Sequence, residues 1–507
     1  MSTFRDILAK RIMVLDGAMG TMIQRYGLSE SDFRGSEFVD HTLPLEGNND
    51  ILVLTRPDII SAIHRQYLEA GADIIETCTF NSQRISQQQY GTEGLIYRLN
   101  YVAAQIARAE VERMNALTPE RPRFVAGSIG PTGKTLSISP DVENPGYREI
   151  DFDTLMSAYT EQIDALVAGG VDLLLVETLF DTLNAKAALM AVQKVFAQRS
   201  VELPIILSIT IADAAGRTLS GQTLEAVVTS VSHFNLTAVG LNCSFGAAQM
   251  EPFLRELSDI APCFVSAYPN AGLPNAMGEY SQTAEMMATD IARFAKRGIV
   301  NIVGGCCGST PEHIMSIAKA VASYAPRKVK GCSGAWLAGL EGFNPNGVFV
   351  NVGERCNVAG SRKFLRLIGE RSYTEALAIA RKQVEDGAMV LDINMDDAML
   401  DSESQMVEFL NIMASDPQVA RVPWMIDSSR FEVIVSALKS IQGKAVVNSL
   451  SLKEGEEVFI SRAKVVKSFG AALVVMAFDA IPTAMMHHIV PLSKQTIYNM
   501  TIVGIAW

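Results

Sequence analysis

Short apolar runs of strand length alternate with helical patterns along most of this chain, and this alternation is the strongest constraint on its fold. Most of the runs are apolar on both faces, as parallel strands covered by helices are. Segments such as 57–71 and 151–170 have the period of amphipathic helices and end at glycine. Eight runs precede Ser309: IMVLDGAM (12–19), ADIIETCTF (72–80), RFVAGSIGP (123–131), VDLLLVETL (171–179), PIILSITI (204–211), AVGLNCS (238–244), CFVSAYPN (263–270) and GIVNIVGGCCG (298–308).

Eight strand–helix repeats predict an α/β protein that begins with a (β/α)8 TIM barrel, whose active site would lie at the C-terminal ends of its strands. A doubly wound sheet is the structural alternative. We expect this barrel to occupy residues 1–323, followed by a linker over 324–346 that is rich in glycine, proline and lysine.

The alternation then restarts and predicts a second, truncated (β/α) barrel over residues 347–479. Its five strand-like runs are GVFVNVGER (347–355), MVLDINMD (389–396), VPWMIDSS (422–429), KAVVNSLS (444–451) and AALVVMAFD (471–479). Three further strand–helix units would need about 30 residues each, so residues 480–507 are expected to be a divergent tail.

Charge and hydropathy exclude several classes of protein. The formal net charge is −12, which disfavours a nucleic-acid partner because phosphate binding needs clustered lysine and arginine. No apolar run reaches the roughly 18 residues of a membrane span, so no membrane partner is expected. Asp6, Lys10 and Arg11 interrupt the apolar stretches at the N-terminus, which therefore does not resemble a signal peptide. We expect a cytoplasmic protein.

Three of the seven cysteines follow predicted barrel strands. Cys243 ends the sixth strand, and Cys306 and Cys307 end the eighth. Parallel strands bring these ends to one face, where three thiolates would bind Zn²⁺ and leave a fourth position open for a substrate thiol. Coordination would lower the pKa of that thiol and make it a nucleophile. The alternative is a redox or vicinal disulfide pair, with Cys243 merely buried.

Acidic residues end other strands of the first barrel: Asp16, Glu76 and Glu177. A carboxylate at the mouth could hold the ammonium of an amino-acid substrate, although any one of them could instead cap a helix. The glycines of DGAMGT, Gly17 among them, would permit close backbone approach to a ligand carboxylate.

Several motifs together resemble a known enzyme family. LDGAMGT, GADIIETCTFNS, GLNCS, PNAGLPN and GGCCG resemble the homocysteine-binding barrel of cobalamin-dependent methionine synthases. VNVGERCNVAGS, LDINMDD, MIDSS and KAVVNSLSLKEG resemble the folate barrel of the same enzymes, which is of the pterin-binding type. The resemblance runs from about Ile12 to Asp479. One departure is Cys356, which stands where the family has threonine.

The resemblance implies a role for eleven residues. Cys243, Cys306 and Cys307 would be the catalytic zinc ligands, and Asp16, Gly17 and Glu177 would bind homocysteine. Ala359, Gly360 and Ser361 would contact the pterin of methyltetrahydrofolate, and Asp427 and Asn448 would hydrogen-bond its ring. From spacing alone, Asp427 could instead cap a helix starting near Ser428, and Asn448 could simply close a strand.

The reaction implied is methyl transfer from 5-methyltetrahydrofolate through methylcobalamin to zinc-bound homocysteine, giving methionine. The family's cobalamin-binding module is not in this sequence, so a separate cobalamin-binding polypeptide is one expected partner. Two alternatives remain. One is a stand-alone zinc homocysteine methyltransferase with another methyl donor. The other is a non-catalytic truncated product that only binds zinc and homocysteine.

Overall fold

The first domain is a nearly closed barrel of eight parallel strands. The computed structural model describes residues 3–275, 280–331 and 336–479. Neighbouring strands follow the order β1-β8-β7-β6-β5-β4-β3-β2, and an isolated parallel bridge from Leu15 to Ile74 joins β1 to β2. All eight predicted strands are confirmed: β1 (Met13–Val14), β2 (Ile74–Glu76), β3 (Phe124–Ile129), β4 (Leu173–Leu179), β5 (Ile205–Ile209), β6 (Ala238–Gly246), β7 (Phe264–Asn270) and β8 (Ile302–Val303).

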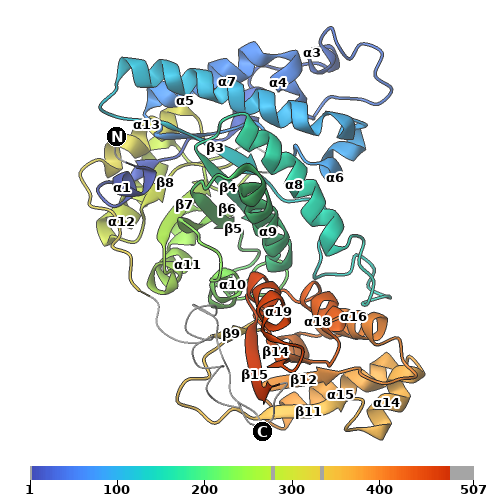
Figure 1. Cartoon of the computed structure of the whole chain (residues 1–507). Coiled ribbons are helices and arrows are strands. Elements are labelled where there is room, and N and C mark those ends of the chain that lie inside the picture. Colours follow the sequence, from blue (N-terminus) through green and yellow to red (C-terminus); the bar gives the residue numbers. More distant parts are fainter. Residues whose placement is uncertain (1–2, 276–279, 332–335, 480–507) are drawn as a thin grey trace.

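Helices surround this barrel (Figure 1). In α5, Pro57 occupies the first turn and Gly71 ends the helix in the left-handed conformation, with φ 106°. In α8, the Asp151 side chain accepts a hydrogen bond from the Thr154 amide at 2.8 Å. The α-helices are α1 (Phe4–Leu8), α2 (Met19–Gln24), α3 (Glu30–Arg34), α4 (Leu52–Thr55), α5 (Pro57–Ala70), α6 (Arg84–Gln87), α7 (Ile96–Leu117), α8 (Phe152–Ala168), α9 (Thr182–Arg199), α10 (Leu224–Val231), α11 (Ala247–Ile260), α12 (Ala284–Arg297) and α13 (Pro311–Val321).

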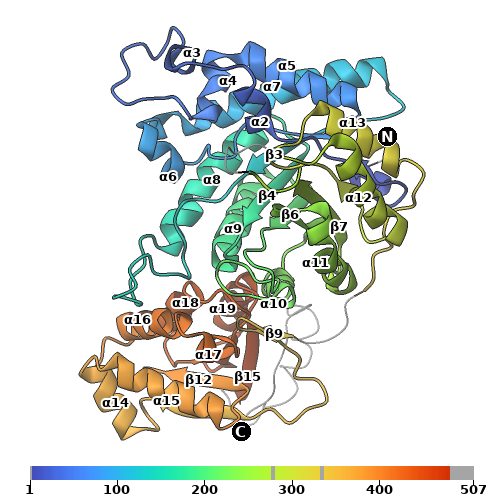
Figure 2. The same cartoon turned by 180° about the vertical axis from the view of Figure 1, so that it is seen from behind.

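The second domain lies at the bottom of Figure 2. It is built on a parallel sheet of five strands in the order β11-β12-β13-β14-β15. The five predicted strands are confirmed: β11 (Val352–Asn357), β12 (Val390–Asn394), β13 (Trp424–Asp427), β14 (Val446–Leu452) and β15 (Ala472–Asp479). Its helices are α14 (Arg362–Gly369), α15 (Tyr373–Glu385), α16 (Ser402–Ala414), α17 (Pro417–Ala420), α18 (Phe431–Leu438) and α19 (Glu456–Ser468). The tail expected over 480–507 lies outside the described residues.

The segment expected to be a linker is partly folded structure. Strands β9 (Leu337–Ala338) and β10 (Gly342–Phe343) form an antiparallel hairpin whose Leu337 and Ala338 are 1% exposed. The hairpin pairs with the second domain, because the Lys444 amide donates to the Ala338 carbonyl at 2.8 Å. It also contacts the first domain, where the Thr223 amide donates to the Leu340 carbonyl at 3.0 Å. The hairpin therefore bridges the two domains.

The two domains share a buried polar interface. In both views α9 and α10 lie beside α18 and α19. Thr182 donates to the Gln442 carbonyl at 2.9 Å, and the Lys186 ammonium donates to the Ile441 carbonyl at 3.3 Å. Farther along, His233 contacts the Ser468 carbonyl at 3.0 Å. No helix among the described residues combines the length and apolar composition that crossing a membrane requires.

Candidate active site and metal centre

Three cysteines from β6 and from the loop after β8, two strands separated by β7, meet at the mouth of the barrel. Cys243 lies in β6, and Cys306 and Cys307 lie in the loop after β8, beyond Gly304 and Gly305. The Cys243 sulfur lies 2.9 Å from that of Cys306 and 3.9 Å from that of Cys307. All three sulfurs lie within 4.8 Å of one another, and none is in a disulfide. The vicinal disulfide alternative is therefore not what the structure contains.

This thiol cluster (Cys243, Cys306, Cys307) has the chemistry of a metal site. Hydrogen bonds from Cys243 and Cys306 lower the pKa of Cys307 to about 3, so the cluster holds a thiolate at neutral pH. The same contacts raise the pKa of Cys306 well above its usual value. Zn–S bonds of about 2.3 Å place tetrahedral thiolates about 3.8 Å apart. The Cys243–Cys307 separation of 3.9 Å is close to this value, and the Cys243–Cys306 separation of 2.9 Å is shorter. Three such sulfurs fit a soft cation.

Three carboxyl groups lie near the thiol cluster: Asp16 and Glu177 are buried, and Glu76 is half-buried. Burial raises the pKa of Asp16 well above its usual range and that of Glu177 to about 7. Burial and then the charge of Glu177 raise the pKa of Glu76. The Glu76 amide donates to Asp16 Oδ2 at 3.0 Å, while Asp16 Oδ1 is buried and has no hydrogen-bond partner among the described residues. A bound ammonium would relieve this concentration of negative charge.

The carboxylates and thiols line one cavity of about 230 Å³. A water molecule takes about 30 Å³ of liquid, so this volume suits a ligand of amino-acid size. Gly17 also lines the cavity, but its lack of a side chain has a structural reason. A Cβ there would lie 2.8 Å from Ser309 Oγ and 2.9 Å from the Tyr67 ring. Close packing inside the protein therefore already requires glycine at this position.

A row of polar side chains crosses the second sheet at its strand ends. Asn357, Asn394, Asp427 and Asn448 are paired in register on β11, β12, β13 and β14. The Asn394 amide donates to Asp427 Oδ2 at 2.9 Å, and Asn357 donates to the same oxygen at 3.5 Å. Helix α18 begins at Phe431 without a side-chain cap, so the capping alternative for Asp427 is wrong.

Asp392 lies on β12 two residues before Asn394, so its side chain is on the same face of the sheet as this row. Asn357 donates to Asp392 Oδ2 at 3.3 Å. Burial, and next the charge of Asp427, raises the pKa of Asp392 to about 7, and burial also raises the pKa of Asp427. Two carboxyl groups that share amide donors in this way match the alternating donors and acceptors of a flat heterocycle.

The predicted loop of Ala359, Gly360 and Ser361 lies beside the row. Asn357 Oδ1 accepts hydrogen bonds from the amides of Ala359 at 2.9 Å and Gly360 at 3.1 Å. Ser361 caps α14 by accepting from the Phe364 amide at 3.2 Å. Their contact with a pterin stays a prediction.

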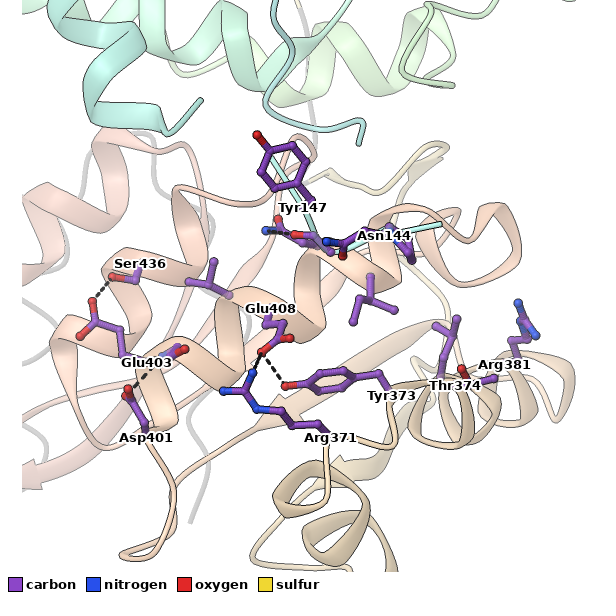
Figure 3. Close-up of a pocket in the computed structure, with 17 residues that line it drawn as sticks. Asn144, Tyr147, Arg371, Tyr373, Thr374, Arg381, Asp401, Glu403, Glu408 and Ser436 are labelled. Carbon is purple, nitrogen blue, oxygen red and sulfur yellow. Dashed lines mark hydrogen bonds and ion pairs between the residues drawn. The ribbon is translucent and has the colours of Figure 1, made fainter. Parts of the chain in front are cut away.

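A different hollow, of about 1000 Å³, lies between the 144–147 loop of the first domain and the second domain (Figure 3). Arg371 and Tyr373 both point toward Glu408, at 3.7 Å and 2.8 Å. Its charged groups are largely paired with one another, and none of the predicted site residues lines it. We therefore do not regard it as the active site.

Sequence reasoning missed the side chains that hold the site residues. Ser128 and Tyr268 donate to Glu177 at 2.5 Å and 3.3 Å. Asn357, Asp392 and Asn394 were also missed, although their motifs were recognised. The available signal was their position at the ends of neighbouring strands, which place them in one row.

The first domain has the fold of α/β barrel proteins whose ligand site opens at the C-terminal ends of the strands. Residues 13–321, more than half of the chain, match the family model of homocysteine S-methyltransferases. The chain therefore belongs to the homocysteine S-methyltransferase family, and it is a methyltransferase of that type. Residues 353–502 match the model of pterin-binding enzymes, a range that runs past Asp479 into the segment expected to be divergent.

Solved structures give a weaker likeness. The metallated form of the homocysteine methyltransferase MmuM from Escherichia coli is 22% identical, with a TM-score of 0.48, over 61% of this chain and 96% of that one. Its apo form is 20% identical, with a TM-score of 0.44, over the same 61% and 96%. The 3-hexulose-6-phosphate synthase from Salmonella typhimurium is 12% identical, with a TM-score of 0.28, over 52% and 93%.

Proposed function

We propose that this chain is the homocysteine- and folate-binding portion of a cobalamin-dependent methionine synthase, active in the cytoplasm. The observation that carries the proposal is the single cavity in which the thiol cluster meets three carboxyl groups, two of them buried. A thiol substrate that also bears an ammonium group complements such a cavity. The proposed domains are 1–323 for homocysteine, 324–346 as the connection and 347–479 for folate.

Cys243, Cys306 and Cys307 would hold Zn²⁺ in this proposal. When bound, the ion would supply a Lewis acid that lowers the pKa of the homocysteine thiol. The carboxylates of Asp16 and Glu177 would hold the homocysteine ammonium and so direct its sulfur toward the thiol cluster. Glu76, whose pKa burial and then the charge of Glu177 raise, would be the third carboxyl group beside that ammonium.

Asp427, Asn448 and the loop of Ala359, Gly360 and Ser361 would bind 5-methyltetrahydrofolate, the proposed methyl donor. The row across β11 to β14 supports this assignment because it presents carboxylate acceptors and amide donors in one plane. Methylcobalamin would carry the methyl group between the two domains and would be bound by a separate module or polypeptide. A homocysteine methyltransferase with a sulfonium or betaine donor would not need a pterin site, so the alternative leaves the polar row across β11 to β14 without a function.

The test is methyl transfer to homocysteine by the full chain loaded with zinc. With added methylcobalamin, we expect the methyl group to pass to the homocysteine thiolate, giving methionine and cob(I)alamin, which is followed by its visible absorbance. With 5-methyltetrahydrofolate and cob(I)alamin, we expect methylcobalamin to form. Activity with S-methylmethionine or betaine but not with methylcobalamin would instead establish the stand-alone alternative. Stoichiometric homocysteine binding without any transfer would establish the non-catalytic one.

A further inference from the structure

Three residues at the mouth of the first barrel adopt left-handed backbone conformations. The φ angles are 58° at Thr178, 59° at Cys243 and 58° at Ser244. This region is uncommon for residues other than glycine, and for a β-branched residue such as Thr178 it is a strained outlier. Strained residues persist only where their surroundings enforce the conformation, and they concentrate at functional sites. Something must therefore hold the ends of β4 and β6 in this shape.

The Asn242 side chain connects these two strand ends. Its Nδ2 donates to Thr178 Oγ1 at 2.8 Å, and its Oδ1 accepts from the Thr178 amide at 3.2 Å. The same oxygen accepts from Ser208 Oγ, on the intervening strand β5, at 2.6 Å. Asn242 is 1% exposed and Ser208 is fully buried, so these bonds are shielded from water. One side chain thus ties three adjacent strands together at the level where two of them bend.

The two bends carry the groups proposed to bind opposite ends of the substrate. Cys243 directly follows Asn242, and Glu177 directly precedes Thr178. The strand registers shift at the same places, between Val176 and Leu179 on β4 and between Asn242 and Gly246 on β6. The bonds of Asn242 to Thr178 therefore fix where the Cys243 sulfur lies relative to the Glu177 carboxylate.

We propose that Asn242 is a positioning residue that sets the distance between the thiol cluster and the ammonium-binding carboxylate. This inference rests on the proposed function. Its consequence is specificity for the length of an amino-acid thiol. Homocysteine places one more methylene between sulfur and ammonium than cysteine does, and a fixed separation would favour the longer molecule.

Four variants separate positioning from general stability. Asn242→Ala removes all three hydrogen bonds. Asn242→Asp keeps both acceptor contacts to Thr178 and Ser208 and is the conservative rescue. The matched control is Asn301→Ala, because Asn301 is also fully buried and hydrogen-bonded at the opposite end of the barrel, to the Val265 amide at 2.9 Å and the Arg327 carbonyl at 2.8 Å. Ser208→Ala provides a milder change at the same network if Asn242→Ala does not fold.

The measurements are the visible spectrum of the Co²⁺-loaded protein and the Kd values of homocysteine and cysteine by calorimetry. We expect Asn242→Ala to alter the cobalt–thiolate bands and to reduce the preference for homocysteine over cysteine about tenfold, the scale of one methylene. Asn242→Asp should restore most of the wild-type bands and most of the preference for homocysteine. Ser208→Ala should shift the bands and the preference in the same direction as Asn242→Ala. Asn301→Ala should lower the Tm but leave the bands and the preference unchanged.

Unchanged bands and preference in Asn242→Ala would overturn the proposal, and so would an Asn242→Asp variant as impaired as Asn242→Ala. If Asn242→Ala does not fold, unchanged bands and preference in Ser208→Ala would overturn it equally. A wild-type protein that shows cobalt–thiolate bands but binds no homocysteine would refute the proposed function. In that case, altered bands in Asn242→Ala would still support the positioning role, and unaltered bands would refute it. A wild type without cobalt–thiolate bands would overturn both.

Discussion

At the scale of single residues, the first site places two acidic clusters in one cavity: the thiol cluster and the carboxyl groups of Asp16, Glu76 and Glu177. The thiol cluster holds a thiolate at neutral pH, whereas burial raises the pKa values of Asp16, Glu76 and Glu177 and so favours their protonated forms. Each group is completed by a positive partner, a metal ion for the sulfurs and an ammonium for the carboxylates. The chemistry of the site is therefore incomplete until both are bound.

Replacing one member of the thiol cluster should remove the metal. We expect Cys306→Ala to lower the zinc content from about one ion per chain to nearly none, because two thiols remain where a structural or catalytic zinc needs at least three protein ligands. Elemental analysis of the purified protein measures this. Cys263→Ala is the control, since Cys263 lies outside the cluster and its loss should leave the zinc content unchanged.

In the second domain, Asp427 offers the strongest test of the pterin site. Asp427→Asn keeps the size of the side chain but removes its charge and one acceptor, so we expect the Kd of 5-methyltetrahydrofolate to rise about tenfold or more. Calorimetry on the full chain measures it. Asp386→Asn, an exposed change at the end of α15, should leave that Kd within about twofold. Equal affinity in both variants would contradict the assignment.

At the scale of elements, the sequence predicted the strands better than the connections. All thirteen predicted strands form, because buried parallel strands are apolar on both faces and leave a signal in every residue. The hairpin of β9 and β10 was missed, since its strands have two residues each and its stability comes from pairing with distant Lys444. The motifs alone could not predict that Asp427 lies in one row with the asparagines of the neighbouring strands. That prediction requires the register of strand pairing, which is known only from the folded sheet.

Arg327 attaches the start of the connection between the domains to the first barrel. Arg327 is 3% exposed, and its guanidinium donates to the carbonyls of Ser258, Ala261 and Cys263 at 2.6 to 2.8 Å. Arg327→Ala would leave these buried acceptors without donors, so we expect the free energy of unfolding to fall by about 3 kcal/mol. Urea denaturation measures it.

The control in the same connection is Lys330→Ala. Lys330 pairs with Asp259 at 2.9 Å, but both side chains are largely exposed, and such pairs contribute at most about 1 kcal/mol. A loss in Lys330→Ala equal to that in Arg327→Ala would show that burial of the guanidinium is not the cause.

At the scale of the whole molecule, the interface between the domains brings three basic side chains near one another: Lys186, which is buried, and His233 and Lys444, which are half-buried. Burial, and next the charge of Lys444, lowers the pKa of Lys186 to about 7. Burial, and next the charge of Lys186, lowers the pKa of His233 to about 3. The charge of Asp181 acts in the opposite direction and raises the pKa of Lys186, but its effect is smaller than that of burial. Asp181 also accepts hydrogen bonds from the Ser137 amide and hydroxyl. The domains should therefore pack most tightly when Lys186 is neutral.

This arrangement predicts how stability depends on pH. Folding moves the pKa of Lys186 from 10.5 down to about 7, so between these values the unfolded chain binds more protons than the folded protein. The free energy of unfolding should consequently rise with pH across this window, by up to about 1.4 kcal/mol per pH unit from this group. Below pH 7 the lysine is charged in both states and contributes no further slope.

Urea denaturation at several pH values between 7 and 10 tests the prediction by comparing the wild type with Lys186→Met. The variant lacks the titrating amine, so its slope should be smaller than that of the wild type by the contribution of this one group. Thr182→Val is the matched control, because it removes an uncharged hydrogen bond to the Gln442 carbonyl across the same interface. It should lower stability equally at every pH. Parallel pH profiles for the wild type and Lys186→Met would mean that the buried lysine keeps its charge by virtue of the Ile441 and Gly443 carbonyls that accept from it.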